Sequence, residues 1–115
     1  MIDEELLELA AKATGSDFSN KLIPEVQGKR KGPFILKGSR WVQWNPLDDD
    51  GDALRLVVRL RLSPMMRTLG CDTTDLNGTA GAYEKWGGDP YAATRRAIVR
   101  AAAEIGRQMQ EGGAA

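Results

Sequence analysis

Apolar side chains recur with the period of an α-helix over residues 3–13, and acidic side chains open this stretch. Negative charge is favourable there because the helix dipole leaves a partial positive charge at the first turn. Gly15 follows the last periodic position and is suited to end a helix. We therefore expect an N-terminal helix over residues 3–13. Its apolar positions are Leu6, Leu7, Ala10 and Ala11.

No period holds from residue 16 to residue 32. Pro24, Gly28 and a run of three basic residues, 29–31, interrupt this stretch. Such a composition is typical of a surface connection, and a loop of this length is either functional or mobile. We expect residues 16–32 to form a surface loop.

Two short runs rich in aromatic and β-branched residues follow, over residues 34–36 and 40–44. Gly38 and Ser39 stand between them at positions suited to a turn. These runs predict two strands, and the short connection suits a hairpin.

Residues 53–62 fit two patterns. As a strand, the segment has these apolar residues on one face: Leu54, Leu56, Val58, Leu60 and Leu62. As a helix, its buried stripe comprises Ala53, Leu54, Val57 and Val58. Alternation slightly favours the strand, whereas the acids of residues 48–52 offer several carboxylates that can cap a helix. We predict a helix over residues 53–62.

The stretch from residue 63 to residue 86 predicts a second pair of strands. We expect Ser63 and Pro64 to end the preceding element, because proline cannot continue a helix. Residues 65–71 and 82–86 are compatible with strands. The Thr, Asp, Asn and Gly residues between 72 and 81 are typical of a turn.

The C-terminal segment carries the clearest helix signals. Asp89 stands at an N-cap position, Pro90 at the first helical position, and Gly112 and Gly113 beyond the expected end. One face of this helix collects the apolar residues Tyr91, Ile98, Ala101, Ile105 and Met109. The opposite face collects Arg96, Arg100 and Arg107. We expect residues 112–115 to form a frayed tail.

Together these elements predict one α+β domain over residues 1–115, with about three helices and a small, mainly antiparallel sheet. The length suits a single core. Hydrophobic residues at 42% and charged residues at 28% are near the averages of globular proteins, so the chain can offset its ordering entropy.

The charge balance changes the expected partners. Sixteen basic side chains match sixteen acidic ones, so the chain lacks the overall positive field of many nucleic-acid or membrane-surface binders. A single cysteine excludes an intramolecular disulfide and suits a reducing compartment. The N-terminus is acidic and no apolar run approaches the ~20 residues that a bilayer span needs. We expect a cytoplasmic protein with no membrane partner.

The residues for common catalytic chemistry are missing. Histidine is absent and Cys71 is the only cysteine, which excludes His-based acid–base catalysis, Ser–His and Cys–His pairs, and Cys-rich or imidazole zinc sites. No base is evident beside Cys71, so we expect an inert, structural thiol. We expect no catalytic residue, no cofactor and no bound metal, and hence a protein that is not an enzyme.

The aspartates of residues 48–52 resemble an oxygen-rich cation site at first sight. Their register argues against this. With Asp48 as the first position of a calcium loop, Ala53 replaces the turn glycine and Arg59 replaces the bidentate glutamate. Helix capping is therefore our preferred interpretation. A magnesium ion at this cluster is the one enzymatic alternative.

Gly87 and Gly88 precede a helix start, as in turns that bind phosphate. Asp89 places its own negative charge at that point, so self-capping is our preferred interpretation. Neither GxxxxGK[ST] nor GxGxxG occurs in the chain, and nucleotide binding has no further support.

Basic and aromatic residues define a candidate interaction surface. It comprises Lys29, Arg30, Lys31, Lys37, Arg40, Trp41, Trp44, Arg96, Arg100 and Arg107. Basic groups beside exposed rings suit contacts to a nucleic-acid backbone combined with base stacking. The alternative, which we prefer, places Trp41 and Trp44 in a core and the arginines on the solvated face of an amphipathic helix.

Two segments resemble a known family. WNPLDDDGDALRLVVRL, residues 44–60, and GDPYAATRRAIVRAAAEIGR, residues 88–107, are similar to two blocks of the phage ABA sandwich domain family and cover about a third of the chain. The resemblance implies a compact α/β/α sandwich and a phage or prophage genome as the source. It also favours the helix over residues 53–62. It implies no catalytic residues, since the family's biochemical role is uncharacterised.

From these observations we expect a non-enzymatic phage or prophage accessory protein that binds a host or phage protein in the bacterial cytoplasm. A nucleic-acid-binding module that uses the basic and aromatic region 29–40 is the alternative.

Overall fold

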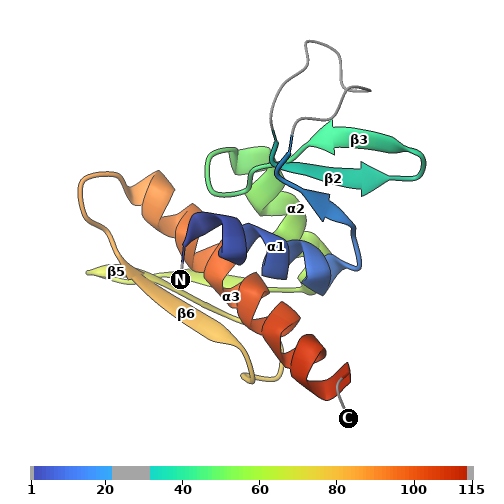
Figure 1. Cartoon of the computed structure of the whole chain (residues 1–115). Helices are drawn as coiled ribbons and strands as arrows, with labels where there is room; N and C mark the ends of the chain where they lie inside the picture. Colours follow the sequence, from blue (N-terminus) through green and yellow to red (C-terminus); the bar gives the residue numbers. More distant parts are fainter. Residues whose placement is uncertain (1, 22–31, 114–115) are drawn as a thin grey trace.

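The computed structural model describes residues 2–21 and 32–113. Within them the chain forms three helices and six strands (Figure 1). In chain order these are α1 (Asp3–Thr14), β1 (Phe18–Ser19), β2 (Phe34–Lys37), β3 (Arg40–Gln43), α2 (Asp50–Leu60), β4 (Ser63–Met66), β5 (Gly70–Thr74), β6 (Gly81–Lys85) and α3 (Pro90–Gly113). The predicted α+β class is confirmed. The expectation of one small sheet is wrong, because the strands divide between two antiparallel sheets, in the orders β1-β2-β3 and β4-β5-β6.

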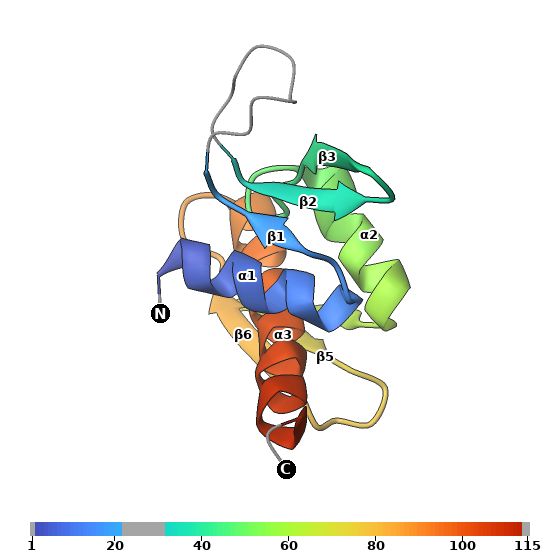
Figure 2. The ribbon, with the colours of Figure 1, turned by 45° about the vertical axis from the view of Figure 1, so that its right-hand side comes forward.

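Helix α3 is the centre of the fold. Helix α1 crosses it on one side, the sheet β4-β5-β6 packs against another, and α2 contacts its first half (Figures 1 and 2). The α1–α3 crossing is close because small residues meet there. Ala10 and Ala11 of α1 and Ala102 of α3 are fully buried. A Cβ atom at Gly106 would lie 1.9 Å from the backbone oxygen of Leu9.

Helix α1 matches its prediction. It spans Asp3–Thr14, ends at Gly15 in the left-handed conformation (φ 77°), and buries the four expected apolar residues. The left-handed C-cap lets the Gly15 amide donate to the carbonyl oxygen of Lys12.

The choice of helix over strand is confirmed by α2 for residues 53–60, whereas Arg61 is the C-cap of α2 and Leu62 lies beyond it. Asp49 is its N-cap, and its carboxylate accepts a 2.8 Å hydrogen bond from the Asp52 amide. The acidic lead-in therefore caps the helix, as expected.

The buried stripe predicted for α2 is wrong at two positions. Leu54 is 61% exposed and Val58 is 71% exposed, whereas Leu56, assigned to the strand pattern, is 2% exposed. The helix packs on the core through Ala53, Leu56 and Leu60, at i, i+3 and i+7. The apolar residues of α2 thus exceed what one buried face needs, and the surplus faces outward.

The predicted hairpin is confirmed by β2 and β3, which pair from Phe34↔Gln43 to Lys37↔Arg40 around the turn at Gly38. The expectation of a continuous loop over residues 16–32 is wrong at Phe18–Ser19, which forms β1 against β2. A two-residue strand has no period of its own. It forms here because Phe18 pairs with Ile35 and its ring meets Trp44 edge-on at 6.3 Å.

The second sheet begins earlier than predicted. Ser63 and Pro64, expected to end an element, start β4 and pair with Thr74 and Thr73. The single strand expected over residues 65–71 is instead split between β4 and β5, and the turn expected over residues 72–81 shortens because β5 continues to Thr74. The partner strand expected over residues 82–86 is confirmed by β6.

Helix α3 begins as predicted, because the Asp89 carboxylate accepts hydrogen bonds from the amides of Tyr91 (3.0 Å) and Ala92 (3.3 Å). The prediction of a frayed tail is wrong at residues 112 and 113, because the helix continues through Gly113. Its predicted apolar face is buried at Ile98 and Ala101 but exposed at Tyr91 and Met109. The packed elements cover its central turns and leave these two ends open.

Candidate functional site

An apolar groove lies between α2, β4 and the start of α3. Its volume is about 410 Å³. Its lining residues are Asp50, Ala53, Leu54, Val57, Pro64, Met66, Trp86, Pro90, Tyr91, Thr94, Arg95 and Ile98. We call this set the apolar groove.

Two helices form its walls. Along α2 the lining residues Asp50, Ala53, Leu54 and Val57 recur at i, i+3, i+4 and i+7, which places them on one helical face. The residues of α3 that form the other wall have the same i, i+3, i+4 and i+7 spacing: Tyr91, Thr94, Arg95 and Ile98. Strand β4 adds Pro64 and Met66 between the helices. The groove therefore lies between one face of α2 and one face of α3, and no other described element covers these two faces.

Large apolar side chains at this site face solvent. Leu54 is 61%, Met66 60% and Tyr91 71% exposed. Single exposed apolar residues are ordinary on protein surfaces, but several around one concave site indicate an interaction surface. The indole nitrogen of Trp86 donates to the Arg67 carbonyl oxygen at 3.0 Å. This bond satisfies the one polar atom of the ring, so Trp86 adds apolar surface to the groove.

One ion pair closes an end of the groove. Arg95 Nη1 lies 2.7 Å from Asp50 Oδ1, and Arg95 Nε donates to the carbonyl oxygen of Leu47 at 2.9 Å. These bonds tie the first turn of α2 to α3. They hold the spacing of the two walls at the end where the acidic lead-in of α2 begins.

The structure brings three predicted surface residues together in a different place. Arg96, Arg100 and Arg107 line a second groove, of about 350 Å³, beside β6 and α1. Its other lining residues are Leu6, Leu9, Gly81, Ala82, Glu84, Ala103 and Glu104. We call it the arginine groove. Each arginine has an acidic partner: Arg96 pairs with Asp3 at 2.9 Å, Arg100 with Glu84, and Arg107 with Glu104 and Glu111.

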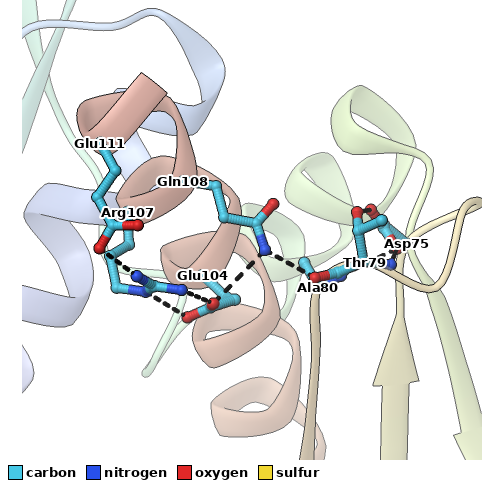
Figure 3. A network of polar contacts seen from close by, with 7 residues as sticks. All are labelled: Asp75, Thr79, Ala80, Glu104, Arg107, Gln108 and Glu111. Atoms are coloured by element: carbon cyan, nitrogen blue, oxygen red, sulfur yellow. Dashed lines mark hydrogen bonds and ion pairs between the residues drawn. The ribbon is translucent and has the colours of Figure 1, made fainter. Parts of the chain in front are cut away.

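A polar network links the end of the arginine groove to the β5–β6 turn (Figure 3). Hydrogen bonding to Arg107 lowers the pKa of Glu104, and the same contact raises the pKa of Arg107. Gln108 Nε2 donates to the carbonyl oxygen of Thr79 at 2.7 Å. Helix α3 is thereby joined to the turn that Asp75 organises.

Asp75 makes this turn sensitive to acid. Its carboxylate accepts bonds from the Thr79 hydroxyl (2.7 Å), the Thr79 amide (2.8 Å) and the Ala80 amide (3.2 Å), and these bonds lower its pKa below the ordinary 3.8. A carboxylate whose pKa is lower in the folded state than in the unfolded state stabilises the fold. This stabilisation is complete above the unfolded-state pKa and is lost as the pH falls through the folded-state pKa.

We therefore expect Asp75→Ala to lower the melting temperature at pH 7, and the difference from the unsubstituted chain to shrink below about pH 3.8. Thermal unfolding followed by circular dichroism between pH 2 and pH 7 measures this. Asp48→Ala is the control, because Asp48 is exposed and its side chain makes no bond in the described part of the chain. A difference for Asp75→Ala that does not change with pH would contradict the assignment.

The remaining predicted surface residues are separated from the arginines. Lys37 and Arg40 face each other across the β2–β3 turn and are exposed. Trp41 is half-buried beside them, opposite Leu36. Trp44 is 5% exposed, so it belongs to the core and is not available for stacking on a base. Lys29, Arg30 and Lys31 lie outside the described residues.

Other candidate chemistry of the sequence is accounted for by the fold. Cys71 is fully buried, with its Sγ 3.6 Å from the Thr73 hydroxyl, as expected of a structural thiol. In residues 2–21 and 32–113 no three His, Cys, Asp or Glu side chains are placed to share a metal ion. No described helix combines the length and apolar character needed to cross a membrane.

Sequence reasoning missed the apolar groove. The available signal was the excess of apolar residues on α2 together with Tyr91 at the first turn of α3. Each was assigned to the core of its own helix. Only the packing shows that these residues remain uncovered and that they face one another.

Comparison with known proteins adds no assignment. No protein-family model, no curated protein and no solved structure matches this chain. The resemblance to the phage ABA sandwich family therefore stays a prediction from residues 44–60 and 88–107.

Proposed function

We propose that this chain is a non-enzymatic phage or prophage accessory protein that binds a host or phage protein through the apolar groove. The observation that carries the proposal is the exposure of Leu54, Met66 and Tyr91 around one concave apolar site. Phage origin rests on the sequence resemblance, and the cytoplasmic location rests on the single cysteine and the lack of a long apolar run.

Hydrophobic burial supplies the driving force for this binding. Each apolar Å² removed from water contributes roughly 25 cal/mol, and aromatic residues such as Tyr91 are enriched among residues that dominate binding energy. The walls are two helical faces, so the shape suits an amphipathic helix or a short apolar segment laid between them. A partner's leucine or phenylalanine side chain would occupy the space between Leu54 and Ile98.

The charges at one end of the groove select among such segments. Asp48, Asp49 and Asp50 are exposed at the start of α2. Arg95 offsets one of these charges through its pair with Asp50. The end is therefore acidic, and it favours a partner segment that carries Lys or Arg beside its apolar residues.

Nucleic-acid binding has less support. The described residues of the predicted basic and aromatic surface divide between the β2–β3 hairpin and α3. Trp44 is buried, and the three arginines of α3 are paired with carboxylates. What favours it is the exposed pair Lys37 and Arg40, which make no ion pair within the described residues. It is tested by the nuclease arm of the experiment below.

The test uses the tagged full chain to retain proteins from a bacterial lysate, with and without nuclease, followed by mass spectrometry. Two lysine substitutions on α2 form a matched pair. Leu54 and Val58 lie one turn apart and are similarly exposed, but only Leu54 lines the groove. We expect Leu54→Lys to weaken binding of the retained protein at least tenfold, and Val58→Lys to leave it unchanged.

Titration of the purified partner by calorimetry gives the affinities. Equal retention by both variants would contradict binding at the apolar groove. Loss of the retained material on nuclease treatment would instead support the nucleic-acid alternative.

A further inference from the structure

Strand β6 has an open edge. It lies at the end of the order β4-β5-β6, and its register with β5 shows which backbone groups face outward. The Asp75 amide donates to the Ala80 carbonyl and the Trp86 amide to the Leu69 carbonyl, so even-numbered residues of this strand bond to β5. Gly81, Tyr83 and Lys85 therefore point their amide and carbonyl groups away from the sheet.

The opposite edge of the same sheet is blocked. The Arg67 amide donates to the Gly70 carbonyl, so the odd-numbered residues of β4 bond to β5 through their backbones. The backbone polar groups of Pro64 and Met66 therefore point away from β5. Proline has no amide hydrogen, so β4 offers a single outward donor within its four residues. Proline on an edge strand is one of the devices that prevent strand addition. Strand addition to this sheet is thus directed to β6.

The outward groups of β6 are self-complementary. In an antiparallel pair of two β6 strands centred on Tyr83, Tyr83 faces the partner's Tyr83 and Gly81 faces the partner's Lys85. Every outward amide then meets an outward carbonyl. Arg100 Nη1 already donates to the Tyr83 carbonyl at 3.0 Å, but a carbonyl oxygen accepts two bonds, so this contact leaves room for a second donor.

The same register brings opposite charges together. It places the partner's Glu84 opposite Ala82, and Ala82 lines the arginine groove. Each arginine of that groove already pairs with a carboxylate of its own chain, but 38% to 41% of each arginine side chain stays exposed, so a guanidinium can donate to a further carboxylate. By symmetry, each chain's Glu84 would also reach the groove of the other chain.

We propose that β6 pairs antiparallel with β6 of a second copy of this chain, and that the partner's Glu84 enters the arginine groove. The pairing joins two three-stranded sheets into one sheet of six. The assembly closes as a dimer because Pro64 leaves β4 unsuited to continue it. The zero net charge of the chain removes overall repulsion between the copies.

The test is sedimentation equilibrium of the full chain from about 1 µM to about 500 µM, a span that covers typical weak and tight dimers. We expect the mass to rise toward twice that of one chain. Lys85→Pro removes an outward amide without touching the bonds to β5, and should raise the dissociation constant at least tenfold. Met66→Pro makes the same change on the β4 edge and should leave the constant unchanged. Circular dichroism establishes that both variants are folded.

Amide hydrogen exchange gives a readout that needs no variant. In the dimer the amides of Gly81, Tyr83 and Lys85 should exchange more slowly than in dilute protein, whereas the Met66 amide should not change. A monomer at every concentration would overturn the proposal and leave this edge to a strand from another protein. A dimer whose β6 amides stay unprotected would overturn it as well, and would point to a different interface.

Discussion

Replacing Gly106 with alanine is expected to lower the free energy of unfolding by about 3 kcal/mol, near the upper end for overpacking in a close-packed interior. The added Cβ would lie 1.9 Å from the backbone oxygen of Leu9 and 2.8 Å from its carbonyl carbon. Backbone atoms cannot rotate away as a side chain can, so α1 has to shift on α3. Alanine stabilises a helix by about 1 kcal/mol relative to glycine. The expected loss of unfolding free energy is the net value that already includes this gain.

Gly112→Ala is the matched control for this substitution. Gly112 lies on the same helix, and nothing is within 4 Å of where its Cβ would be. We expect this variant to be unchanged or slightly more stable, by up to about 1 kcal/mol. Urea unfolding followed by tryptophan fluorescence gives both values. Equal stability of the two variants would mean that α1 does not pack on α3 as closely as described.

Leu56→Ala is expected to cost about 3 kcal/mol of unfolding free energy, within the range for leucine truncated in a core. Leu56 is 2% exposed and belongs to the main hydrophobic cluster with Trp44 and Leu62. Truncation removes its transfer free energy and leaves a cavity that the packed helices fill only in part.

The neighbouring substitutions Leu54→Ala and Val58→Ala should change the free energy by no more than about 0.5 kcal/mol, because both side chains face solvent. This contrast also tests the structure of the segment. In a strand all three side chains would share one face and their truncations would cost similar amounts. A loss at Leu56 alone is the pattern of the helix, and three equal losses would contradict it.

Local chemistry made several elements predictable from the sequence. Gly15 ends α1, Asp49 and Asp89 cap the two later helices, and the Gly38–Ser39 connection forms a hairpin turn. In each case a residue acts on backbone groups within a few positions of itself. The α+β class follows from these elements and their order.

Other features depend on partners that are distant in sequence. Strand β1 forms only because Phe18 meets Ile35, and Pro64 enters a strand only because its missing amide faces away from β5. The arginines of α3 were expected on a solvated face. They find carboxylates on α1, β6 and their own helix instead.

The sequence by itself therefore determined the helices, their caps, the first hairpin, the α+β class and the lack of histidine chemistry, because short-range sterics, capping and residue identity decide these. Only the tertiary structure decided how the strands divide into two sheets, which face of α2 is buried and which edge of the second sheet is open. It also decided the candidate site. Leu54, Met66 and Tyr91 are apolar in any conformation, but whether a side chain is buried or left on a shared groove depends on what packs against it.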